Sequence, residues 1–141
     1  MTYRTRYCAP LPRKGAATVE LAILLPFLAF AFVIGVDYAR IFYYSVIVAN
    51  CARNGAAYGC ADTASANDQT AIQTAALADA SNLGGQATVT STTDSSSAPT
   101  YVDVTVTYPF TTLTNYPAVP SSVTLNRTIR MRVAPAVPKF N

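Results

Sequence analysis

Histidine and tryptophan are absent from this 141-residue sequence, and charged residues make up only 12% of it. Without histidine, the Ser-His and Cys-His pairs that activate nucleophiles in many enzymes cannot form. So few cysteines without an imidazole also make a poor zinc site. Neither a glycine-rich phosphate loop nor an HExxH helix is present. The sequence therefore predicts a protein that is not an enzyme and that binds no cofactor, metal or small-molecule substrate.

Positive charge is also scarce outside one short segment. Four of the ten basic residues precede Gly15, and they are Arg4, Arg6, Arg13 and Lys14. The rest of the chain holds six basic and seven acidic residues, a balance of −1. This balance predicts no nucleic-acid surface beyond the N-terminal segment, whose positive charge indicates membrane topology instead.

A long apolar run follows this basic segment. From Leu21 to Val36 no side chain is charged, and residues 16–36 would form about 31 Å of helix. This length matches the hydrocarbon core of a bilayer, so we expect a transmembrane helix over residues 16–36. The positive-inside rule keeps the basic end in the cytoplasm and sends the chain after Asp37 outward, which predicts a membrane protein with an extracytoplasmic domain.

A carboxylate stands at the front of the apolar run, five residues after Gly15. An ionised group at hydrocarbon depth costs roughly 2.5–3.5 kcal/mol, so Glu20 needs either a partner or contact with the headgroups. A conventional signal peptide has a shorter apolar core and would be cut near Ala39 or Arg40. An uncleaved signal anchor is a second alternative. We favour a third, in which cleavage on the cytoplasmic side after Gly15 leaves the membrane helix attached.

These residues resemble a known family. Glycine followed by glutamate at the fifth position, in front of a long apolar helix, is similar to the processing site of type IV pilins and pseudopilins. A longer ordered set resembles the TadE-like proteins of tight-adherence (Tad) pilus and secretion systems. Its parts are Gly15–Pro26, Gly35–Arg40, Ala49–Tyr58, Tyr108–Phe110 and Arg127–Val133.

The resemblance implies a pilin-like fold and a minor pilin or pseudopilin, cut between Gly15 and Ala16 by a prepilin-type peptidase. The product would begin at Ala16, and its new amino group could pair with Glu20 of a neighbouring pilin subunit inside the bilayer. Two alternatives stay open. One is an uncleaved, bitopic anchor of the same apparatus, and the other is an exported adhesin or binding domain with Ser/Thr-rich loops.

Beyond the membrane we expect the helix to continue as a stem. Ala49, Ala52 and Ala56 recur on one face, where they could pack against another subunit or within the chain. Gly55 and Gly59 are expected to loosen the helix. Three tyrosines fit the outer aromatic belt of the membrane, and they are Tyr38, Tyr43 and Tyr44.

The remaining sequence predicts a second helix and a small antiparallel sheet, so the outer part is an α+β head within residues 37–134. The helix should run over 69–81, capped by Asn67–Asp68 and stopped by Gly84–Gly85. Alternating apolar residues predict strands near 101–108 and 123–133, with a weaker strand from Ala87. Arg127 falls on the apolar face of its strand and needs a partner or the sheet edge.

Three segments are expected to lack regular structure. Residues 92–99 should form a Ser-rich loop, 109–120 a proline-containing connection, and 135–141 a tail. The leader, residues 1–15, carries Cys8 and would be lost on cleavage. Cys51 and Cys60 would then remain, and they could form a disulfide in an oxidising compartment if the chain turns near Gly55 or Gly59.

Overall fold

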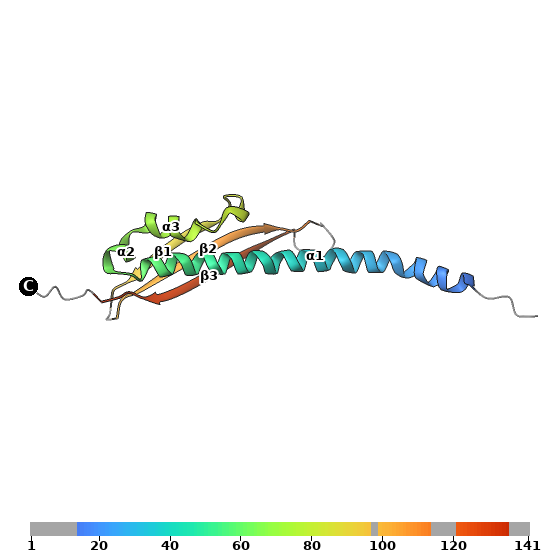
Figure 1. Ribbon diagram of the computed structural model, residues 1–141, viewed down its shortest axis with the longest axis horizontal. Helices are drawn as coiled ribbons and strands as arrows, with labels where there is room; N and C mark the ends of the chain where they lie inside the picture. Colours follow the sequence, from blue (N-terminus) through green and yellow to red (C-terminus); the bar gives the residue numbers. More distant parts are fainter. Residues whose placement is uncertain (1–13, 97–98, 114–120, 136–141) are drawn as a thin grey trace, which may run out of the picture. The chain divides into compact units, whose positions relative to one another are not determined.

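The computed structural model describes residues 14–96, 99–113 and 121–135. The leader up to Arg13, the tail from residue 136 and residues 114–120 of the proline-containing connection lie outside this range. The chain forms two compact units, which divide between Gly35 and Val36. The first consists of helix, and the second, which we call the head, adds short helices and a three-stranded sheet (Figure 1). The predicted α+β fold is confirmed.

Helix α1 (Lys14–Gly59) extends from the first unit into the head. It continues through Pro26, whose nitrogen cannot donate to the carbonyl of Ala22. The predicted stem is therefore helical. The expected loosening is wrong at Gly55, which lies inside the helix, whereas α1 does end at Gly59.

Gly55 and Gly59 of α1 allow close packing. A Cβ atom on Gly55 would lie 3.0 Å from the Cβ of Ala76 and 3.1 Å from Cγ1 of Val104. A Cβ on Gly59 would lie 3.1 Å from Cγ2 of Val102. Because these positions carry no side chain, α1 lies closer to the helix over Gln69–Leu77 and to the sheet than any other residue would allow.

A pair of short helices follows α1. Asp62 caps α2 (Thr63–Asn67) by accepting a hydrogen bond from the backbone nitrogen of Ser65, and Asp68 caps α3 (Gln69–Leu77) by accepting from that of Ala71. A short 3-10 turn, η1 (Ser81–Leu83), comes next. The predicted helix over 69–81 is thus shorter than expected, and its last turn is replaced by η1. Gly84 and Gly85 have positive φ angles, but they do not stop α3, which ends at Leu77, and Gly84 is the C-cap of η1 instead.

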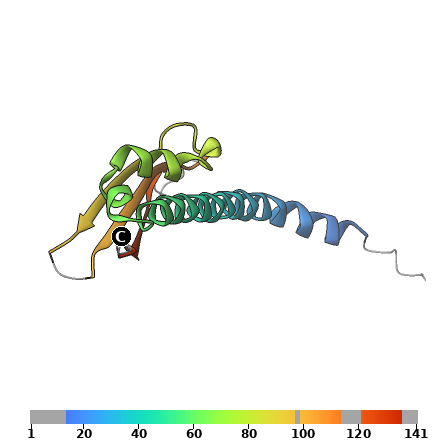
Figure 2. The same ribbon diagram turned by 60° about the vertical axis from the view of Figure 1, so that its left-hand side comes forward.

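Three antiparallel strands, β1 (Thr88–Asp94), β2 (Tyr101–Thr111) and β3 (Ser122–Arg132), form a sheet in the order β1-β2-β3. The inner face carries the alternating valines of β2, which pack with α1 and α3 (Figures 1 and 2). Buried residues of α1, α3, η1, β1 and β2 make one core, which includes Val48, Ile72, Leu83, Val102, Val104 and Val106, and the side chains of β3 are at most half-buried against it. Phe110 is also buried.

Two strands are longer than the sequence predicted. β1 continues to Asp94, into the expected Ser-rich loop, and β2 continues through Pro109 to Thr111. Proline is tolerated there because β1 ends at the pair Thr88–Thr107, so beyond Thr107 strand β2 has β3 as its only partner in the sheet.

Candidate functional site

The first candidate site is the start of α1, where the sequence places the processing site and the membrane carboxylate. Gly15, Ala16 and Glu20 all lie in the first two turns and are exposed. Within the described part of the chain, no atom outside the backbone of its own helical turn and its chain neighbours lies within 4 Å of the position that a Cβ on Gly15 would occupy. Among the described residues, none forms an ion pair with Glu20. The peptide bond after Gly15 and the carboxylate are therefore both accessible to another molecule.

Ala16 and Glu20 are four residues apart on one helix, so they lie on the same face with an axial rise of about 6 Å. Ala16 belongs to the first turn, where unpaired backbone N–H groups concentrate positive potential, whereas Glu20 lies beyond that turn, which carries no acidic side chain.

The apolar run after Glu20 is uncovered. Its large side chains are 39–72% exposed within the chain, namely Leu21, Ile23, Leu24, Leu25, Phe27, Leu28, Phe30 and Phe32. The helix is long and apolar enough to cross a membrane. An apolar surface of this extent is incompatible with exposure to water, so the helix is suited to a lipid environment or to the helices of other subunits.

A second group of residues lies at the start of the head. Asp37 is 5% exposed and accepts hydrogen bonds from Nη1 of Arg40 and from the backbone nitrogen of Leu113, both at 3.1 Å. The guanidinium of Arg40 lies 5.0 Å from the ring centroid of Phe110. Asp37 therefore links α1 to the segment that follows β2, and neither this link nor its buried position was predicted.

The expected aromatic belt is only partly formed by free side chains. Tyr38 is 71% exposed, whereas Tyr44 is half-buried and stacks on Tyr108 with ring centroids 5.3 Å apart. The hydroxyl of Tyr43 accepts a hydrogen bond from Asn82 in η1. Tyr43 and Tyr44 therefore hold α1 to the rest of the head. Of the three tyrosines, Tyr38 is the one whose exposed side chain fits the predicted aromatic belt.

The structure does not contain the disulfide between Cys51 and Cys60, because the helix stays regular through Gly55 and the chain turns only after Gly59. Helix α1 separates the two residues by about 13 Å of axial rise, and both thiols are free. Cys51 is fully buried. Burial raises the pKa of its thiol, and the nearby charge of Asp79 raises it further. The alanine stripe is also explained within the chain, since Ala52 and Ala56 are completely buried in the core.

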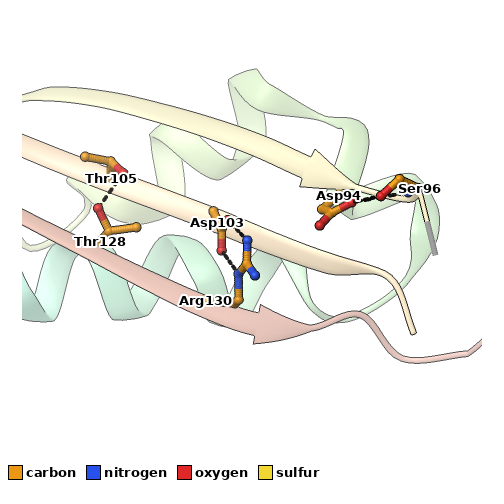
Figure 3. A network of polar contacts seen from close by, with 6 residues as sticks. All are labelled: Asp94, Ser96, Asp103, Thr105, Thr128 and Arg130. Carbon is orange, nitrogen blue, oxygen red and sulfur yellow. Dashed lines mark hydrogen bonds and ion pairs between the residues drawn. The ribbon is translucent and has the colours of Figure 1, made fainter. Parts of the chain in front are cut away.

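The outer face of the sheet is polar (Figure 3). Asp103 accepts two hydrogen bonds from Arg130, at 2.7 Å from Nε and 2.6 Å from Nη2, and the hydroxyls of Thr105 and Thr128 lie 2.8 Å apart. The charge and hydrogen bonds of Arg130 hold the pKa of Asp103 below its usual range. These contacts stabilise the pairing of β2 with β3, and no sequence motif marks them.

The comparisons with known proteins bear on the first of these sites. The family model for TadE-like proteins matches residues 15–57. Over this segment the chain is similar to TadE-like proteins. The match begins at Gly15 and covers nearly all of α1, including the exposed apolar run, Asp37 and the buried small residues. Searches among curated proteins and solved structures gave no match. The resemblance to TadE-like proteins of Tad pilus systems is thereby confirmed for the helix.

Proposed function

We propose that this chain is a minor pilin or pseudopilin of a Tad-type pilus or secretion system, and that it acts as a structural subunit with no catalytic role. A prepilin-type peptidase would cut between Gly15 and Ala16 on the cytoplasmic side of the inner membrane. The helix over residues 16–36 would then hold the head on the outer side. The observation that carries this proposal is the accessible pair of Gly15 and Glu20 at the front of an uncovered, TadE-like apolar helix.

Cleavage would give the chain a charge that complements Glu20. The new α-amino group of Ala16 and the carboxylate of Glu20 are about one helical turn apart along α1. A neighbouring subunit displaced by a distance of that order could therefore place its Glu20 against the Ala16 amino group. Each charge alone is costly in hydrocarbon, and the pair offsets this cost only when the subunits are in register. Glu20 would thus select the correct alignment during assembly.

One observation favours a second candidate, an uncleaved bitopic anchor of the same apparatus. Helix α1 begins at Lys14, so the bond between Gly15 and Ala16 lies inside its first turn. A peptidase needs an extended substrate, and the first turn would have to unwind. Two features support such unwinding. Gly15 lowers helix stability, and the first turn contains no acidic side chain to stabilise its end.

The decisive experiment is intact-mass and N-terminal analysis of the protein from its native membrane. A chain that begins at Ala16 is expected. A chain that retains Gly15 and the residues before it would establish the anchor instead. A start near Ala39 or Arg40 would identify an ordinary secreted domain and overturn both proposals.

Substitution of Glu20 tests the assembly role separately. We expect Glu20→Ala to insert in the membrane and to be processed normally, but to enter sheared pilus fractions poorly. Val19→Ala is the matched control, because Val19 is also exposed, 60% by area, and carries no charge. Normal incorporation of Glu20→Ala would contradict the pairing.

A further inference from the structure

Charge is segregated across the head. Between Arg53 and Arg127 the chain contains five aspartates and no lysine or arginine. Three of these, Asp62, Asp68 and Asp79, are exposed on or directly beside α2 and α3, and we call this surface the acidic flank. Strand β3 contains no acidic residue and carries three exposed arginines, Arg127, Arg130 and Arg132. We call this strand the basic edge.

Helix α3 and strand β3 lie at opposite edges of the sheet, whereas α2 lies near the end of β3, where Thr63 and Arg132 line one hollow. Strands β1 and β3 are the two edges of the sheet, and α3 packs against β1. The side chain of Gln73 donates a hydrogen bond to the carbonyl of Val89, and that of Gln69 donates to the carbonyl of Ser91. Helix α3 thus satisfies outward carbonyls of β1 and closes that edge (Figure 1).

The basic edge is open by comparison. Among the described residues, no backbone hydrogen bond reaches the free edge of β3, the edge that faces away from β2. Its inner apolar side chains are only half-buried, and they are Val123, Leu125, Ile129 and Met131. A shallow hollow between α1 and β3 is lined by Ser45, Thr124, Leu125, Asn126 and Arg127. Of the three arginines, Arg130 is paired with Asp103, whereas Arg127 and Arg132 have no ion-pair partner among the described residues.

These features select one mode of self-association. Pairing of β3 with β3 of a second copy would bring three arginines against three, and an inward-facing charge on an edge strand opposes such pairing. The opposite charges on the acidic flank and the basic edge are complementary instead. We propose that the basic edge of one copy docks on the acidic flank of a second copy. Because the two surfaces differ, the contact is heterologous and repeats from subunit to subunit.

The physical driving force has two parts. Arg127 and Arg132 gain carboxylate partners on the acidic flank. Hydrogen bonds from Ser65 keep the pKa of Asp62 below the usual range, which favours its ionised carboxylate. The half-buried side chains of β3 lose their remaining contact with water. Charge complementarity sets the orientation, and the apolar strip adds affinity.

Cysteine cross-linking in membranes tests this contact. Two differently tagged full-length chains are expressed together, both with Cys8→Ser and Cys60→Ser, so that the buried Cys51 is the remaining native thiol. One copy carries Asn126→Cys on the basic edge, and the other carries Thr70→Cys on α3. Under mild oxidation we expect mixed dimers, with few dimers that join two Asn126→Cys copies.

Charge variants show whether the arginines direct the contact. Arg127→Glu with Arg132→Glu should lower the mixed cross-link by about tenfold, since repulsion replaces attraction. Arg127→Gln with Arg132→Gln should lower it less. Thr107→Glu, which adds one negative charge on the outer face of the sheet, is the control and should leave the cross-link unchanged.

Several outcomes would overturn the proposal. These are dominant Asn126–Asn126 dimers, no cross-link between copies, cross-linking to a different protein only, or a mixed cross-link that does not respond to the arginine variants. The contact joins two heads and requires neither removal of the leader nor the Glu20 pair. Glu20→Ala should therefore leave the cross-link intact, so failure of the proposed function and failure of this contact give different results.

Discussion

The two parts of α1 differ in the kind of side chain that they bury. From Gly15 to Gly35 the helix exposes its leucines and phenylalanines and contacts no core. From Val36 to Gly59 it buries alanine, glycine and cysteine against the sheet and α3. Side-chain size follows the surroundings. Large apolar groups suit lipid or other subunits, whereas small groups permit close contact with the rest of the head.

The strongest test of this difference removes one phenylalanine from each part of the molecule. Phe110 is 1% exposed in the head, and Phe32 is 72% exposed on the apolar helix. Phe110→Ala should lower the free energy of unfolding of the head by about 3–5 kcal/mol, because it leaves a cavity. Phe32→Ala should leave it unchanged. Urea unfolding of the full chain in detergent, followed by tyrosine fluorescence, measures both, and equal effects would contradict the comparison.

A second test inserts a side chain at one glycine in each part of α1. Gly55→Leu must displace Ala76 and Val104, which lie 3.0–3.1 Å from the new Cβ, whereas no atom lies within 4 Å at Gly35. We expect Gly55→Leu to destabilise the head by about 1–3 kcal/mol through overpacking. Gly35→Leu is the control and should have no such effect in the same urea titration. A stable Gly55→Leu head would show that α1 does not pack as closely as described.

Sequence patterns predicted the elements that depend on local signals. The apolar run, the aspartate cap of α3 and the alternating valines of β2 each have a local physical cause, and each was found. The α+β class followed from their order. Arg127, which the sequence placed on an apolar face, lies on an edge strand where it can remain exposed.

The errors concern features that depend on distant partners. Gly55 and Gly59 would weaken an isolated helix, but Val102, Val104 and Ile72 lie where a side chain would extend. Pro109 would interrupt a central strand, but the pairing of β1 with β2 reaches only Thr107, so Pro109 does not face β1. The register of the sheet is needed to identify the side chains beside these glycines and the extent of β1, and one sequence does not give it. The site around Asp37 was incomplete for the same reason, because Leu113 is 76 residues away along the chain.

The third test compares the two carboxylates of α1. Asp37→Ala removes the acceptor of Arg40 and of the buried backbone nitrogen of Leu113, which should cost the head about 1–2 kcal/mol. Asp37→Asn retains an acceptor oxygen and should cost less. Glu20→Ala, in the other part of the helix, should not change unfolding of the head. Equal stability of Asp37→Ala and the unmodified chain would show that Asp37 does not hold the end of β2.

The smallest expected effect separates the two parts of the molecule by pH. Arg130 lowers the pKa of Asp103 in the folded head, so folding favours the ionised carboxylate. This contribution is fully present above the ordinary aspartate pKa of about 3.9 and is lost as pH falls through the lower folded value. The pair is partly exposed, so its loss should cost less than about 1 kcal/mol. Arg130→Gln should therefore reduce the acid dependence of unfolding between pH 5 and 2 by about this amount.

The first part of α1 contains Glu20 as its one acidic residue, and its helical signal in detergent should persist over the same pH range. A loss of that signal in parallel with the head would mean that the two parts unfold together.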